Sequence, residues 1–269
     1  MTQAGVRPNS LVRFGIFRCF AASLVVIAAV ATVSFASCAA TRSEVFDRHY
    51  PFASGGTFVL ENVNGSVSVD GWNKEEIEVR AVKLSGGDPD DLDRVQIDVE
   101  ECSQELAVRT KYPNDAGVAV SVEYHIYVPY RILLGGVKTV NGSVLVRGVD
   151  GTGTLRSVNG NVEVLDSAGR FSEHTTNGNV RMELRRLEDG GPMDIETVNG
   201  SIALGLPADA HADLRVLSFN GDFQSELPVE SGHMTSPRAF RGRIGSGGGE
   251  VSVRTINGGV RLFLERPRI

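Results

Sequence analysis

The sequence predicts an all-β protein, and three observations support this prediction. Glycine makes up 31 of the 269 residues, well above its usual share of about 7%. The dipeptide Asn-Gly occurs seven times. Apolar and polar residues alternate after each pair, which is the period-two pattern of a half-buried β-strand, and no segment of comparable length shows a helical period.

Residues 1–37 have the features of a bacterial signal peptide. They contain three arginines and no acidic residue, and an apolar run from Phe20 to Phe35 follows the basic start. A basic start, a short apolar stretch and small residues after it are typical of a secretory signal. The apolar run is 16 residues long. Because a membrane-spanning helix needs about 20 apolar residues, cleavage is favoured over retention in the membrane.

The end of this segment, Phe35-Ala36-Ser37-Cys38, resembles the bacterial lipobox, in which small residues precede a lipidated cysteine. We expect Cys38 to carry the lipid, with residues 38–47 as a linker; secretion after cleavage behind Ala36 is the alternative. The residue after Cys38 is Ala39 rather than an acidic residue, which resembles the sorting signal of outer-membrane lipoproteins. The sequence therefore predicts an outer-membrane lipoprotein that faces the periplasm or the cell surface. Cys102 is then the remaining cysteine, and we expect it to be a small buried apolar residue.

Residues 48–134 are predicted to form an antiparallel β-sheet. Longer alternating segments begin at Glu76, Arg94, Glu105 and Val118, and consecutive strands of this kind are typical of antiparallel pairing. We expect this sheet to cover the first coil of the repeat, because an uncovered end exposes unpaired backbone groups.

One turn in this region, from Asp88 to Asp93, is rich in carboxylates. Carboxylate oxygens are ligands that calcium prefers, but the turn lacks the glycine and the distal glutamate of an EF-hand loop. A solvated acidic turn is therefore favoured, and calcium binding is left as the alternative.

Residues 135–269 are predicted to form a repeat domain. Each unit has the pattern Ser or Thr, any residue, Asn, Gly, any residue, apolar, any residue, apolar. From Asn141 onward the intervals between pairs are 18, 18, 22, 21 and 37 residues, and we expect a long loop from Leu227 to Gly248 within the last interval. The repeated asparagines are Asn64, Asn141, Asn159, Asn177, Asn199, Asn220 and Asn257.

Two architectures fit this repeat. In an antiparallel meander or sandwich, each Asn-Gly pair would close a tight hairpin, because both residues tolerate positive φ. In a parallel β-solenoid, equivalent residues of successive coils would lie about 4.8 Å apart. The solenoid is favoured, because a column of stacked amides, each bonded to the next, needs asparagine in every coil.

The signal-like start, the early "ENVNGSVSVDGW" and the serial "VNGSV" and "VNGNV" units resemble a bacterial putative-adhesin family of unknown function. The family is described as a single-stranded right-handed β-helix. The resemblance covers the chain after its signal. It implies a β-helical fold and an adhesin-like role, permits a link to envelope stress, and brings no catalytic residues.

The sequence contains no motif of a known catalytic, metal or cofactor site. Its five histidines are far apart and lack the spacing of metal ligands, and no nucleophile elbow, phosphate loop or dinucleotide fingerprint occurs. We therefore expect no cofactor and no metal. The formal net charge of -6 argues against nucleic acid as a partner.

The predicted function is a non-catalytic, adhesin-like or scaffold module that binds an envelope protein or a glycan. Two alternatives remain. One is an envelope-stress sensor that binds a protein partner. The other is a carbohydrate-active enzyme, which would use paired acids such as Glu163, Glu183, Asp194 and Glu196.

Overall fold

The computed structural model describes residues 42–113, 117–236 and 238–265. The chain divides into two compact units, Met1–Ala39 and Ala40–Ile269. The predicted signal peptide and Cys38 lie outside the described residues. Among the residues described, none belongs to a helix that is both long and apolar enough to span a membrane.

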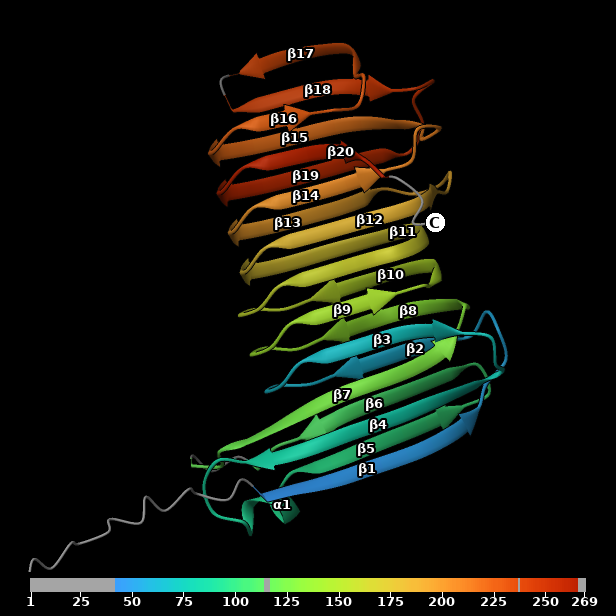
Figure 1. Cartoon of the computed structure of the whole chain (residues 1–269), viewed down its shortest axis with the longest axis vertical. Coiled ribbons are helices and arrows are strands. Elements are labelled where there is room, and N and C mark those ends of the chain that lie inside the picture. The colour runs from blue at the N-terminus through green and yellow to red at the C-terminus, as the bar shows by residue number, and fades with distance from the viewer. Residues whose placement is uncertain (1–41, 114–116, 237, 266–269) are drawn as a thin grey trace, which may run out of the picture. The chain divides into compact units, whose positions relative to one another are not determined.

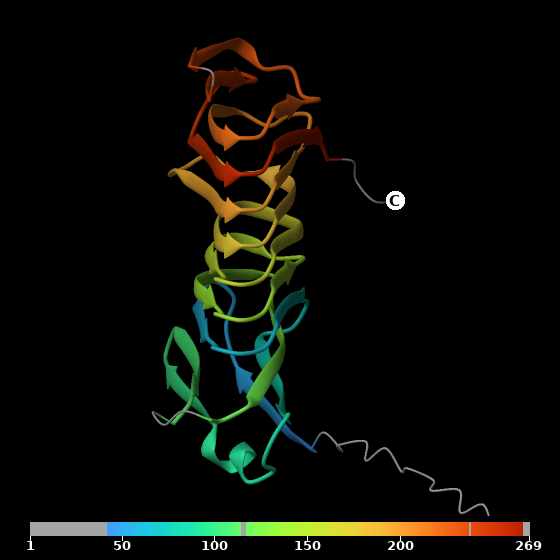
Figure 2. The same cartoon turned by 90° about the vertical axis from the view of Figure 1, so that its left-hand side faces the viewer.

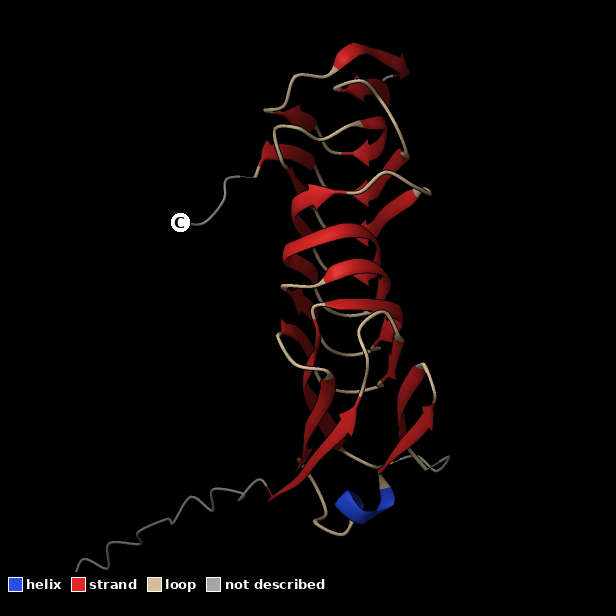
Figure 3. Cartoon of the chain, turned by 90° about the vertical axis from the view of Figure 1, so that its right-hand side faces the viewer, coloured by secondary structure: helices blue, strands red, loops and turns tan. Residues whose placement is uncertain are grey.

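The second unit is built almost entirely of β-strands, which confirms the all-β class. Its described part contains twenty strands and one short helix, α1 (Asp91–Arg94), which is the blue element in Figure 3. The strands form one mixed sheet. The sheet curls so that two rows of strands, here called row A and row B, enclose an apolar core (Figures 1 and 3).

Row A is defined by one continuous series of pairings. In spatial order its strands are β5 (Gln96–Cys102), β6 (Glu105–Lys111), β2 (Thr57–Glu61), β8 (Arg131–Lys138), β10 (Asp150–Arg156), the second half of β11 (Val162–Asn177), β13 (Met193–Asn199), β19 (Glu250–Asn257), β15 (Ala212–Asn220), β18 (Ala239–Ile244) and β17 (Glu230–Ser236).

Row B is defined in the same way. In spatial order its strands are β1 (Arg42–Pro51), β4 (Glu76–Ser85), β7 (Val120–Pro129), β3 (Val67–Trp72), β9 (Val144–Arg147), the first half of β11, β12 (Val180–Leu187), β14 (Ile202–Leu206), β20 (Val260–Leu264) and β16 (Phe223–Ser225). The β11 strand belongs to both rows because it turns the corner near Asp166, whose φ is 47°.

The sheet is parallel in its middle and antiparallel toward its ends. Strands β1, β4 and β7 pair antiparallel in row B, as do β5 and β6 in row A. At the opposite end β15, β18 and β17 are antiparallel. Strands β2 and β3 lie within residues 48–134, yet they pair parallel with β8 and β9 and form a coil of the repeat.

The first strand begins earlier than expected. Residues 42–47, which the sequence assigned to a linker, form the first part of β1 and pair with β4; Arg42 lies opposite Ser85 and Asp47 opposite Arg80. The sheet therefore starts four residues after Cys38.

Each Asn-Gly pair connects a row A strand to a row B strand (Figure 2). For example, Asn141 and Gly142 lie between β8 and β9. The β8 strand pairs with β2 and β10, whereas β9 pairs with β3 and β11. The strands that flank the pair have their partners in other coils, so the alternative of a meander built from Asn-Gly hairpins is wrong.

The glycines of these pairs are required by close packing rather than by positive φ. A Cβ atom on Gly160 would lie 2.1 Å from the carbonyl oxygen of Gly142, and a Cβ on Gly178 would lie 2.1 Å from that of Gly160. Among the seven glycines, Gly65 alone has a left-handed φ, at +116°. Neighbouring turns approach so closely that only a residue without a side chain fits.

The last repeat in the sequence is not the last coil in space. Strands β19 and β20 pair with β13 and β14 on one side and with β15 and β16 on the other, so they lie between two earlier coils (red in Figure 1). The long loop expected from Leu227 to Gly248 is also wrong, because β17 and β18 occupy most of it. Strand β18 pairs antiparallel with β15, and β17 pairs antiparallel with β18, so both strands lie beyond the coil of β15 and β16.

Candidate functional site

A groove of about 860 Å³ crosses row A at the ends of β6, β2, β8, β10, β11 and β13. With a strand spacing of about 4.8 Å, six strands give the groove a length of about 24 Å. All the strands except β6 contribute residues that directly precede an Asn-Gly turn. The lining residues are Glu61, Asn62, Val63, Arg109, Thr110, Lys111, Lys138, Thr139, Val140, Arg156, Ser157, Val158, His174, Thr175, Thr176, Glu196 and Val198.

One side of the groove is apolar. It is formed by the residue that precedes the repeated asparagine, which is aliphatic in every coil of the groove except that of Thr176. Val63, Val140 and Val158 are 36%, 38% and 40% exposed, and beyond the groove the same column continues with Ile256 and Phe219 at 45% and 50%. Large aliphatic side chains repeated along one line form an exposed apolar stripe, which is a feature of binding surfaces.

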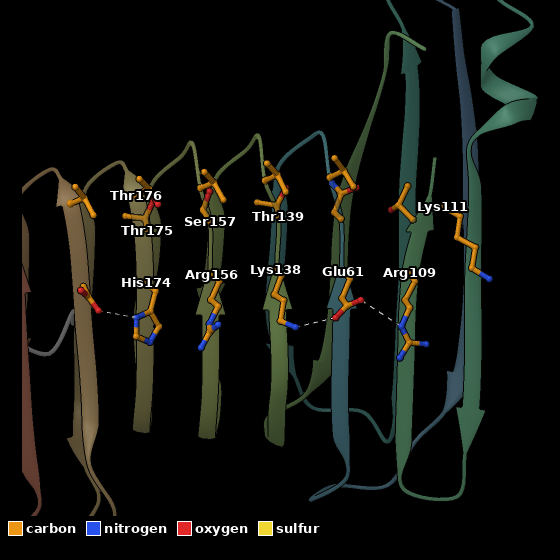
Figure 4. Close-up of a pocket in the computed structure, with 17 residues that line it drawn as sticks. Glu61, Arg109, Lys111, Lys138, Thr139, Arg156, Ser157, His174, Thr175 and Thr176 are labelled. Atoms are coloured by element: carbon orange, nitrogen blue, oxygen red, sulfur yellow. Dashed lines mark hydrogen bonds and ion pairs between the residues drawn. The ribbon is translucent and has the colours of Figure 1, made fainter. Parts of the chain in front are cut away.

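The other side of the groove is charged and is shown in Figure 4. Glu61 accepts a hydrogen bond from Lys138 Nζ at 3.0 Å and lies 3.6 Å from Arg109 Nε. His174 Nδ1 lies 3.7 Å from a carboxylate oxygen of Glu196. Arg156 projects between Lys138 and His174, and no ion pair or hydrogen bond to another described residue engages its guanidinium.

The charges of the groove favour an anion near Arg156. The lining contains Arg109, Lys111, Lys138 and Arg156 against the carboxylates of Glu61 and Glu196. Two of the cations are also paired outside the groove, Arg109 with Glu100 and Lys111 with Asp98. Burial, and next to it the positive charge of Arg156, lowers the pKa of His174 below its ordinary value, so this imidazole is neutral at pH 7.

The floor of the groove is formed by buried hydroxyl groups that already have acceptors. Thr139 Oγ1 donates to Gly65 O at 3.0 Å, Ser157 Oγ to Gly142 O at 2.8 Å and Thr175 Oγ1 to Gly160 O at 2.8 Å. Thr197, Thr255 and Ser218 donate in the same way to Gly178, Gly200 and Gly258. The recurrent Ser or Thr therefore holds neighbouring coils together and leaves little hydroxyl capacity for a ligand.

The seven repeated asparagines lie in one column beside the groove. Their spatial order is Asn64, Asn141, Asn159, Asn177, Asn199, Asn257, Asn220, and after Asn64 each Nδ2 donates to the Oδ1 of the preceding coil at 2.7–2.9 Å. Apart from the half-buried Asn64, these side chains are exposed. The column is thus a surface feature of the turn edge.

The four carboxylates named for an enzyme lie in different rows. Glu163 and Glu183 are in row B, where Arg181 Nε donates to Glu183 Oε1 at 2.7 Å. Asp194 and Glu196 are both on β13 in row A. The structure therefore does not bring all four into one site.

The acidic turn has internal partners. Asp91 accepts from Arg94 at 2.9 Å and Asp88 Oδ1 accepts from the Asp90 amide at 3.0 Å. Across the described residues, three potential metal ligands gather within 4.8 Å of one another at Asp47, His49 and Glu78. The spacing of histidines in the sequence gave no sign of this cluster, since β1 and β4 bring it together. Arg80 lies 3.1 Å from both carboxylates and supplies a positive charge there.

Two further residues differ from what the sequence suggested. Cys102 is exposed and free, not buried, because β5 is an edge strand that pairs with β6. Glu173 of β11 is fully buried beside Leu155 and Ile195, and neither of its carboxyl oxygens has a hydrogen-bond partner. Burial, and next to it the negative charge of Glu163, raises the pKa of Glu173 well above its ordinary value.

The fold and the groove define an all-β protein whose repeated turns build one elongated surface site. Within it, residues 134–262 match the domain family described as Toastrack DUF4097. This match covers just under half of the chain, and it supports the resemblance to an uncharacterised family over those residues. No curated protein matches the chain.

Several solved structures are similar at low sequence identity. A structure described as a putative cell adhesion protein from Clostridium sporogenes is 11% identical, with a TM-score of 0.47; the match covers 83% of this chain and 99% of that one. A structure described as a putative adhesin from Bacteroides fragilis is 12% identical, with a TM-score of 0.38 and coverages of 81% and 97%.

Proposed function

We propose that this protein is a non-catalytic binding module of the cell envelope, exported and lipid-anchored through Cys38, whose groove holds an extended acidic ligand. In this proposal the coils form a parallel β-solenoid, and the adhesin-like or scaffold role depends on the face of row A. The observation that carries it is the unpaired Arg156 in the charged side of the groove, which runs parallel to the apolar side.

The dimensions and the chemistry of the groove support a linear ligand. The lining positions recur in successive coils, so a polymer that lies along the stack meets an equivalent position at every strand, with cations at Lys138 and Arg156. An acidic group of that polymer would pair with Arg156, and its apolar parts would cover Val140 and Val158. Charge complementarity of this kind contributes to specificity and to the rate of association.

Binding of labelled polyglutamate, alginate and dextran to the full chain in detergent tests this proposal. We expect the two acidic polymers to bind, with an affinity that falls as salt rises, and dextran not to bind. Arg156→Glu should weaken binding at least about tenfold, or about 1.4 kcal/mol. The control, Arg186→Glu, changes an exposed row B arginine and should bind like the wild type.

Two results would contradict the proposal. Equal binding by Arg156→Glu and the wild type would show that the groove is not the binding site. Release of shorter products from alginate during the assay would show catalysis and would favour the carbohydrate-active enzyme.

A further inference from the structure

Each Asn-Gly turn contains two groups that can react with each other spontaneously. In an Asn-Gly pair, the glycine nitrogen can attack Cγ of the asparagine side chain. Ammonia leaves and a five-membered succinimide forms, and water then opens the ring to aspartate or isoaspartate. The only co-reactant is water. Asparagine is for this reason among the chemically labile residues of proteins.

Six of the seven glycine amides are held in hydrogen bonds to the next coil. Gly142 N donates to Asn159 O at 3.0 Å, and Gly160 N donates to Asn177 O at 3.0 Å. The amides of Gly65, Gly178, Gly200 and Gly258 donate in the same direction, at 2.8–3.2 Å. A nitrogen held in this way cannot reach its own asparagine Cγ unless the coil opens locally.

The direction of these bonds leaves one amide without an acceptor. Each glycine donates toward the β15–β16 end of the stack, and Asn220 with Gly221 form the outermost turn. No further turn follows, and within the described part of the chain the Gly221 amide makes no hydrogen bond. The Asn220 side chain donates to Asn257 Oδ1 at 2.8 Å, whereas no described donor reaches its own Oδ1.

We propose that Asn220 is a site of spontaneous deamidation in the folded protein and that the other six Asn-Gly pairs are protected by the stack. The reaction replaces the terminal amide of the column with a carboxylate. Asn220 enters the column only as a donor, so its conversion removes the bond to Asn257 and places a negative charge against an acceptor oxygen. The outermost coil, β15 with β16, is thereby loosened.

The opposite end of the column provides a matched control. Asn64 also lies at an end, but the Gly65 amide donates to Asn141 O at 2.8 Å. Asn64 takes part in the column as the acceptor of Asn141 Nδ2, and an aspartate at this position would keep that acceptor. Comparison of Asn64 with Asn220 therefore distinguishes the effect of lying at an end of the column from the effect of a glycine amide without a hydrogen bond.

Peptide mapping by mass spectrometry, after incubation of the full chain in mildly alkaline buffer with detergent, tests the proposal. Because stability against local opening rises from the ends of a structure toward its core, Asn220 should convert at least about tenfold faster than Asn159, Asn177 or Asn64. In denaturant this difference should disappear. Conversion of Asn64 or an inner asparagine as fast as Asn220 in the folded chain would overturn the proposal, as would an Asn220 that stays intact.

Hydrogen exchange tests the structural consequence of deamidation, the loosening of β15 and β16, independently of the reaction itself. Asn220→Asp should speed amide exchange in β15 and β16, whereas Asn64→Asp should leave exchange in β2 and β3 unchanged. Equal effects at both ends would contradict the donor-only role of Asn220. The variant Asn220→Gln should abolish the fast conversion. Loss of the deamidated peptide from its mass spectrum would assign that peptide to Asn220.

Discussion

At the scale of single residues, Glu173 shows that a side chain can contradict the pattern around it. It occupies an inward position between Phe171 and Thr175 on β11, where the alternation calls for an apolar residue. Both carboxyl oxygens are buried without partners. Burial without partners favours the protonated form of this group, because a charge in the core would cost far more than a neutral carboxyl.

Glu173 makes the stability of the protein depend on pH. Its pKa is raised in the folded state, so the folded chain binds the proton more tightly than the unfolded chain. Stability is therefore full below the unfolded pKa and falls as pH rises through the folded pKa. Urea unfolding at about pH 5 and about pH 8 should show this slope, and Glu173→Gln should reduce it.

A second substitution at the same position tests the cost of the unpaired group. Glu173→Leu should raise the free energy of unfolding by about 1 to 3 kcal/mol, because a buried polar group without partners is removed. The exposed Glu123→Gln on β7 is the control and should change neither stability nor its pH dependence. A loss of stability in Glu173→Leu would show that this carboxyl has a partner.

At the scale of elements, the turn between row A and row B is the unit that repeats. Its serine or threonine bonds a glycine carbonyl of the neighbouring coil, its asparagine extends the column, and its glycine permits the close approach. These three roles explain why the three positions recur together.

Gly160→Ala tests the close approach directly. The new Cβ would lie 2.1 Å from Gly142 O, a backbone atom that cannot move alone, whereas a Cβ on Gly191 would meet nothing within 4 Å. We expect Gly160→Ala to lower the free energy of unfolding by at least about 3 kcal/mol, at the upper end of overpacking effects. Gly191→Ala should stay within about 0.5 kcal/mol of the wild type. Similar stability of the two variants in urea would disprove this role of the glycine.

At the scale of the whole chain, the proposed lipid anchor lies close in sequence to the sheet. Three residues separate Cys38 from Arg42, where β1 begins. Four peptide steps reach about 14 Å at most. If Cys38 is lipidated, this short tether keeps Arg42, where β1 begins, near the membrane surface.

Cys38→Ser should release the protein from the membrane fraction and abolish labelling by a radioactive fatty acid. Cys102→Ser is the matched control, because Cys102 is an exposed, free cysteine; this variant should still be labelled and partition into detergent. Unchanged partitioning of Cys38→Ser would rule out lipidation at this residue.

The sequence by itself predicted the features that depend on near neighbours. The alternation around Val162 and Val164 predicted a strand, and the recurrence of asparagine with serine or threonine favoured stacked units over hairpins. The groove was not predicted, although its signal was present: an aliphatic residue precedes the asparagine in most units, and Lys138 and Arg156 occupy equivalent positions.

Tertiary structure alone decided the order of the coils, the burial of Glu173 and the identity of the terminal turn. Strand β19 lies between β13 and β15, so Asn220 rather than Asn257 ends the column. The reason is physical. A turn is determined by residues a few positions apart, whereas the place of a strand in a sheet depends on pairing with segments far away in the chain, and similar repeat units leave several such pairings open.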